Sequence, residues 1–175
     1  MKTIIISDIH GDIDALNSIL YKIEIDNVEK LIILGDFCGY GSDSIDIANR
    51  LNCYKDKLIC VRGNCDTDKF MRCFDIDLPI YQNIRINNIS MTITHGHIYN
   101  PYYLPDMCGN ILISGHTHRS SIKKIDNILC INPGSISRPR DGLKSYALID
   151  NNNILYIKDI NDNIIDYCNL DVKIV

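Results

Sequence analysis

Short β-branched runs alternate with helical periodicity over residues 3–61. Patterns typical of buried strands lie at 3–7, 31–34 and 57–61, and apolar residues at helical spacing occur between them at 12–24 and 44–51. A strand that leads through a helix into another strand predicts a parallel sheet covered by helices. This part of the chain is therefore expected to form an α/β arrangement.

The pattern changes after about residue 80, where short strands are separated by turns rich in Asn and Asp. These residues tolerate the left-handed backbone that two-residue hairpin turns require. The second half is therefore expected to be mostly antiparallel or mixed β-structure. Both halves together predict two packed sheets with helices outside, in a single domain over residues 1–175, because no repeat or linker interrupts the chain. The turns are Asn87-Asn88, Asp126-Asn127, Asn151–Asn153 and Asp162-Asn163.

Composition narrows the class of protein. The 175 residues are 46% hydrophobic and 23% charged, which is ordinary for a globular domain. No apolar run approaches the ~20 residues of a membrane span, and the N-terminus becomes charged too early for a signal peptide. A net charge of −4 argues against a stable complex with nucleic acid. We therefore expect no membrane partner and a cytoplasmic location.

The eight cysteines include no C-x-x-C pair, which gives no support to a zinc knuckle or a thioredoxin-type site. In the reducing cytosol we expect most of them to be free thiols that pack as small hydrophobic side chains.

All five histidines lie in short motifs that directly follow predicted buried strands. Because ligands bind outside the carboxyl ends of strands in α/β folds, these motifs predict one shared site. Each motif alone also has a structural interpretation as a turn, a helix cap or a surface pair, but their joint placement favours a site. The histidine motifs are Asp8-Ile9-His10, His95-Gly96-His97 and His116-Thr117-His118; Gly35-Asp36 and Gly63-Asn64-Cys65-Asp66 follow strands in the same way.

The chemistry of these side chains indicates metal binding. Two Asp, one Asn and several His form a mixed oxygen and nitrogen set, which suits Mn²⁺, Fe²⁺, Co²⁺, Ni²⁺ or Zn²⁺ better than Ca²⁺ or an all-oxygen Mg²⁺ cage. There are too many ligands for one ion and about enough for two, with one carboxylate able to bridge metals ~3.5–4 Å apart.

In its order of motifs the chain resembles the calcineurin-like metallophosphoesterase superfamily, and within it the single-domain YfcE-type phosphodiesterases. The resemblance extends over nearly the whole chain and implies a four-layer α/β/β/α sandwich of two mixed sheets, with a di-metal site, often of manganese, at the strand C-terminal ends. It also implies the ligands: Asp8, His10 and His118 for the first metal, Asn64, His95 and His116 for the second, and Asp36 as the bridge.

One position departs from the wider superfamily. Many members have a histidine after the Asn, where it can protonate the leaving group, whereas this chain has Cys65, as is usual in the YfcE-type branch. His97 is then the best catalytic candidate, either for the leaving group or for the transition state, and a hydrogen-bonding support role is the alternative. Substrate-binding residues stay unassigned.

The expected function is a metal-dependent phosphodiesterase that hydrolyses a small or nucleotide-like phosphoester through a metal-bridging hydroxide. The alternatives are a phosphomonoesterase and a catalytically inactive protein-interaction scaffold of the same fold. A nuclease fits less well, because the acidic balance lacks the electrostatic footprint for DNA. A homo-oligomer is left open.

Overall fold

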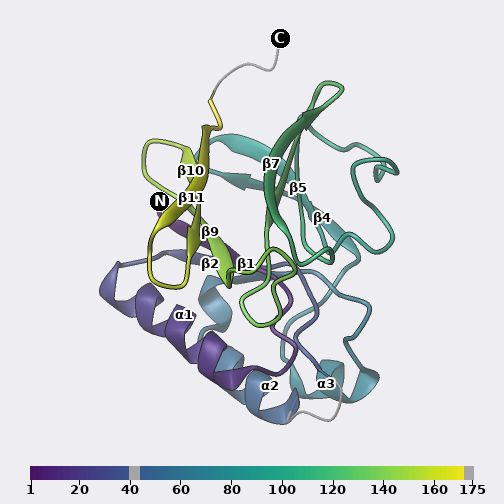
Figure 1. The fold of residues 1–175 in the computed structure, drawn as a ribbon. Coiled ribbons are helices and arrows are strands. Elements are labelled where there is room, and N and C mark those ends of the chain that lie inside the picture. The colour runs from purple at the N-terminus through teal and green to yellow at the C-terminus, as the bar shows by residue number, and fades with distance from the viewer. Residues whose placement is uncertain (40–43, 172–175) are drawn as a thin grey trace.

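The computed structural model describes residues 1–39 and 44–171, which form two β-sheets with helices along one side (Figure 1). The first sheet has the strand order β11-β10-β9-β1-β2-β3. Its parallel part is the predicted one: β1 (Thr3–Ile6), β2 (Lys30–Ile33) and β3 (Leu58–Cys60). Its antiparallel part adds β9 (Ser145–Ile149), β10 (Ile154–Asp159) and β11 (Ile164–Asn169).

The second sheet has the order β4-β5-β6-β8-β7 and is mixed. β5 pairs in parallel with β6, and β6 with β8, while both edge strands pair antiparallel. Its strands are β4 (Tyr81–Ile86), β5 (Ile89–Thr94), β6 (Ile111–Ser114), β7 (Ser120–Ile125) and β8 (Ile128–Pro133).

The helices α1 (Ile13–Ile25), α2 (Ser44–Asn52) and α3 (Asp68–Cys73), with the 3₁₀ turn η1 (Lys55–Lys57), accompany the first sheet (Figure 1). Asp12 caps α1 by accepting from the backbone N–H of Ala15 at 3.0 Å. No helix within residues 1–39 and 44–171 has the length and apolar character needed to cross a membrane.

Both faces of strand β1 are buried, which explains its unbroken apolar sequence. Ile4 and Ile6 belong to the core beneath the helices, together with Leu16 of α1. Ile5 faces the other way, into the core between the sheets, together with Ile93 of β5. The predicted α/β fold with two packed sheets is confirmed.

The layer that covers the outer face of the second sheet differs from the helical layer expected there. The segment 95–110 covers it, with no helix among the described residues there. The backbone N–H of Gly109 donates to the hydroxyl of Thr92 at 3.2 Å, and both Thr92 and Leu112 are fully buried on that side.

The two halves of the chain do not correspond to the two sheets. The last three strands return to the first sheet, where β9 pairs with β1, so the β-rich second half contributes to both sheets. The Asn and Asp turns are confirmed, since Asn87, Asn88, Asp126, Asn153 and Asp162 all have left-handed backbone.

Candidate metal centre

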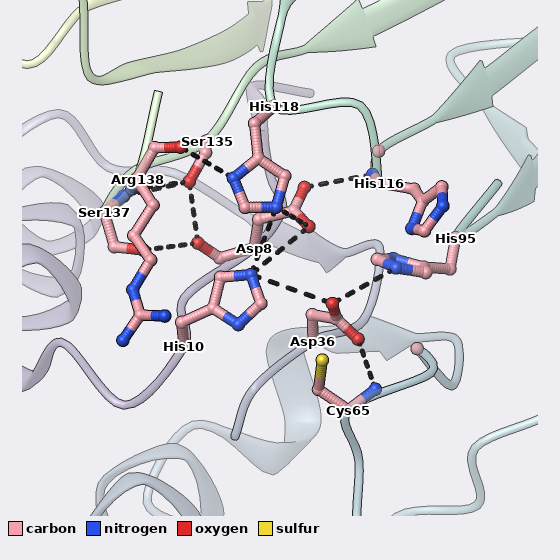
Figure 2. A network of polar contacts seen from close by, with 12 residues as sticks. Asp8, His10, Asp36, Cys65, His95, His116, His118, Ser135, Ser137 and Arg138 are labelled. Atoms are coloured by element: carbon pink, nitrogen blue, oxygen red, sulfur yellow. Dashed lines mark hydrogen bonds and ion pairs between the residues drawn. The ribbon is translucent and has the colours of Figure 1, made fainter. Parts of the chain in front are cut away.

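Loops at the strand ends bring carboxylates and imidazoles to one point between the two sheets (Figure 2). Nε2 of His118 lies 3.2 Å from Oδ1 of Asp8. Oδ2 of Asp36 lies 3.4 Å from Nε2 of His95 and 3.7 Å from Nε2 of His10. Among the described residues, the groups with metal-ligand geometry are Asp8–His10–His118, Asp8–Asp36–His95 and His10–Asp36–Cys65.

Backbone carbonyls orient three of the imidazoles. Nδ1 of His10 lies 3.2 Å from the carbonyl of Cys38, Nδ1 of His95 lies 2.8 Å from that of Leu34, and Nδ1 of His118 lies 2.6 Å from that of Arg138. A neutral ring that donates its Nδ1 proton to a carbonyl presents a lone pair at Nε2. Metal-binding histidines are commonly fixed in this way.

The Nε2 atoms of these imidazoles lie close to other nitrogen and oxygen atoms. Nε2 of His10 lies 3.2 Å from Nε2 of His118, and Nε2 of His95 lies 3.1 Å from Oδ1 of Asn64. Oδ1 of Asp8 is buried without a hydrogen-bond partner among the described residues. Imidazole nitrogens that face one another beside buried carboxylates form a donor set that fits metal ions.

The backbone at these loops is strained. Left-handed φ angles at residues other than glycine are uncommon and cluster at functional sites. The values are 58° at Asp8, 47° at His10, 55° at Asp36, 67° at His116 and 58° at His118. Most of the expected ligands thus occupy a conformation that the surrounding contacts must enforce.

Three supporting side chains were not assigned a role from the sequence. The hydroxyls of Ser135 and Ser137 donate to the carbonyl of Asp8 at 2.9 and 2.8 Å (Figure 2). The buried Asp66 carboxylate accepts backbone N–H groups from both the Gly35-Asp36 and Gly63-Asn64 loops. Asp66 was visible in the sequence as the end of a strand-end motif, and Ser135 as the end of the motif Asn132-Pro133-Gly134-Ser135, whereas Ser137 gave no comparable signal.

Two expected ligands and the catalytic candidate lie at the edge of this cluster. The side-chain oxygen of Asn64 reaches His95, as described above. The ring of His116 lies next to that of His95, with centroids 5.1 Å apart, but belongs to none of the three groups. His97 lies 5.3 Å from His95 between ring centroids, and its Nδ1 is buried without a partner among the described residues.

The ionisation of the cluster follows from burial and charge. Burial raises the pKa of Asp36, but its contacts with His95 and Cys65 together outweigh burial and bring this pKa below its usual value. Burial lowers the pKa of His95, and Asp36 reverses that effect and raises it. Burial and the adjacent Asp36 raise the pKa of Cys65 to about 12, so its thiol is protonated in the metal-free protein.

Comparison with known proteins identifies the family. A family model described as the calcineurin-like phosphoesterase superfamily domain matches residues 1–153. The chain belongs to this superfamily. Phosphodiesterase YfcE of Escherichia coli K12 is 34% identical over 174 residues, covering 93% of this chain and 94% of that protein. The resemblance expected from the motifs is thus confirmed.

Solved structures agree with this assignment. The structure of the E. coli phosphoesterase YfcE has a TM-score of 0.90 to this chain at 29% identity, covering 98% of this chain and 100% of that one. Vacuolar Protein Sorting 29 from Cryptosporidium parvum shares the fold, with a TM-score of 0.68 at 19% identity over 96% of this chain and 97% of that one. This member of the superfamily is a hydrolytic phosphoesterase of a family that uses divalent metal ions.

Gly63 allows two of the loops to approach closely. A Cβ at this position would lie 2.2 Å from both the backbone nitrogen and Oδ1 of Asp36. We expect Gly63→Ala to displace Asp36, with metal affinity falling at least ~10-fold, as happens when residues that position metal ligands are changed. Calorimetric titration with Mn²⁺ measures this. Gly109→Ala is the control, because its nearest neighbour would be 3.9 Å away. Equal affinities of the two variants would contradict the proposed crowding.

Proposed function

We propose that this phosphoesterase hydrolyses phosphodiesters of a small or nucleotide-like alcohol with two divalent transition-metal ions, manganese being the favoured metal. The observation that carries the proposal is the convergence of three imidazole Nε2 atoms on two carboxylates. The 34% identity to phosphodiesterase YfcE supports the choice of a diester over a monoester.

Each ion has its own ligands in this proposal. Asp8, His10 and His118 would hold the first ion, and Asn64, His95 and His116 would hold the second. Asp36 is shared, in keeping with its position between His10 and His95. When bound, the two ions supply a hydroxide nucleophile at neutral pH and offset the charge of the phosphoryl oxygens.

The protein's own residues prepare the site for this chemistry. The backbone carbonyls hold the imidazoles with Nε2 inward, and Asp66 and the two serines fix the loops. Burial lowers the pKa of His97, as do the neighbouring His95 and His116 rings. A neutral His97 is proposed to hydrogen-bond a phosphoryl oxygen or the departing alkoxide.

Activity assays with restored metals test this function. Metal-stripped protein is given each metal in turn and assayed against matched mono- and diesters of p-nitrophenol. We expect hydrolysis of the diester to exceed that of the monoester and to be highest with Mn²⁺. A strong preference for the monoester would favour a phosphomonoesterase, and no hydrolysis with any metal would favour the scaffold alternative.

Cys65 leads to a prediction about leaving groups. A thiol next to two cations tends to lose its proton and then cannot protonate the leaving group. The proton must come instead from water or from His97. The rate should then fall steeply as the leaving-group pKa rises across aryl diesters. Cys65→His should flatten this dependence if the imidazole reaches the leaving oxygen. A flat dependence in the unmodified protein, with chemistry rate-limiting, would mean that an efficient general acid is already present.

The expected location in a reducing cytosol remains a proposal. It is in keeping with cysteines that pack as small hydrophobic side chains, such as the buried Cys38, Cys60 and Cys130.

A further inference from the structure

A cavity of about 710 Å³ opens beside the metal centre. It lies between the outer face of β7 and β8 and the start of the segment 95–110, from Gly96 to Tyr102. His97 and His116 belong to its lining, so the cavity adjoins the proposed ligands of the second ion. Its size falls within the ~300–1,000 Å³ typical of small-molecule sites.

The floor of the cavity follows from strand alternation. Ser121, Lys123 and Ile125 project from the same face of β7, because side chains two residues apart share a face. Across the ladder, Ser121 pairs with Asn132 and Lys123 pairs with Cys130. The other face of β7 places Ile122 against the core between the sheets. The outer face of β7 therefore lines the cavity and takes no part in the core between the sheets.

The lining combines an apolar floor with unpaired positive charge. Ile125 and Cys130 supply apolar surface. Arg119 and Lys123 form no ion pair with any described acidic residue. The acidic side chain in the lining, Asp141, already accepts from the backbone and hydroxyl of Ser120 at 2.6 and 2.8 Å.

The junction with the metal centre carries an unsatisfied polar group. Nδ1 of His97 is buried and has no partner among the described residues, although the ring lines the cavity. Buried polar atoms are nearly always hydrogen-bonded, so this nitrogen is suited to a ligand that enters the cavity. At the rim, the ring of Tyr102 is 86% exposed and offers a flat surface for stacking.

We propose that this cavity binds one ester group of the phosphodiester, a ring system the size of a nucleoside that carries a further anionic group. The ring system contacts the apolar floor and Tyr102, and the additional anion lies near Arg119 and Lys123. This assignment rests on the proposed phosphodiesterase function and specifies its substrate class.

Two esters with the same leaving group test the size of the site. Methyl p-nitrophenyl phosphate and the p-nitrophenyl ester of thymidine 5′-phosphate both release p-nitrophenolate. Ser121 lies on the edge strand β7, and Ser121→Trp places a large side chain in the cavity. Lys124→Trp, on the opposite face of β7, is the matched control. We expect Ser121→Trp to raise KM for the thymidine ester by about tenfold or more, with the methyl ester and the control nearly unchanged.

A charge reversal and a binding measurement test the anionic part. Lys123→Glu should raise KM more for a thymidine ester with an added 3′-phosphate than for the ester without it. In metal-free protein, calorimetry should detect thymidine 3′,5′-bisphosphate, and Ser121→Trp should abolish that binding.

The outcomes separate the two levels of the proposal. If the unmodified, metal-loaded protein hydrolyses neither ester, the proposed function fails and the subsite fails with it. If it hydrolyses both esters and Ser121→Trp affects them equally or not at all, the subsite alone is overturned. Equal effects of Lys123→Glu on the two thymidine esters overturn the anionic part.

Discussion

Asp36→Asn is expected to reduce diester hydrolysis far more than Asn64→Ala. Asp36 lies between His10 and His95 and is proposed to contact both ions, whereas Asn64 is one neutral ligand of the second. Loss of the bridging charge should cost several kcal/mol of transition-state stabilisation, and each ~1.36 kcal/mol is a factor of ten in rate. The measurement is kcat at saturating Mn²⁺, so that occupancy does not limit the rate.

Asp36→Asn replaces one oxygen of a buried carboxylate with an amide nitrogen. The fold of both variants is therefore checked by the unfolding temperature of the metal-free protein. Equal residual kcat for Asp36→Asn and Asn64→Ala would count against a bridging role for Asp36.

Asp66→Ala is expected to disable the site although Asp66 is not itself a proposed metal ligand. Oδ2 of Asp66 accepts from the backbone N–H groups of Gly63 at 2.7 Å and Asp36 at 3.0 Å. Oδ1 accepts from those of Phe37 at 2.7 Å and Cys38 at 3.3 Å. Each buried N–H left unsatisfied costs about 1–3 kcal/mol, so the variant should lose several kcal/mol of unfolding free energy. Urea unfolding of the metal-free protein measures this loss.

Asp66→Asn is the matched variant, because its amide keeps one acceptor oxygen of nearly the same shape. It should retain part of the stability and of the Mn²⁺ affinity that Asp66→Ala loses. A fully stable Asp66→Ala protein with unchanged Mn²⁺ affinity would show that the two loops hold their positions without this carboxylate.

The strand-end placement of Asp8, His10, Asp36, His95 and His118 was predictable because it depends on local order along the chain. A buried run must be followed by a loop, and parallel strands deliver their loops to one edge. The parallel strands β1, β2 and β3 were predictable for the same reason, since a βαβ unit is encoded within neighbouring residues.

Features that depend on distant pairings could not be derived in this way. The return of β9 to β1 joins residues far apart in sequence, and no local pattern specifies that partner. The contacts of Ser135 and Ser137 with the Asp8 carbonyl have the same origin. The cavity beside β7 also depends on how the segment 95–110 crosses the second sheet, which its sequence does not encode locally.

The stoichiometry of bound metal tests the central claim most directly. The protein is expressed with supplied manganese, purified without chelator and analysed for metal and protein in the same sample. We expect close to two transition-metal ions per chain, because the donor set is too large for one ion and Asp36 is placed to be shared. A firm maximum of one ion per chain, with Asn64 and His95 dispensable for activity, would contradict it.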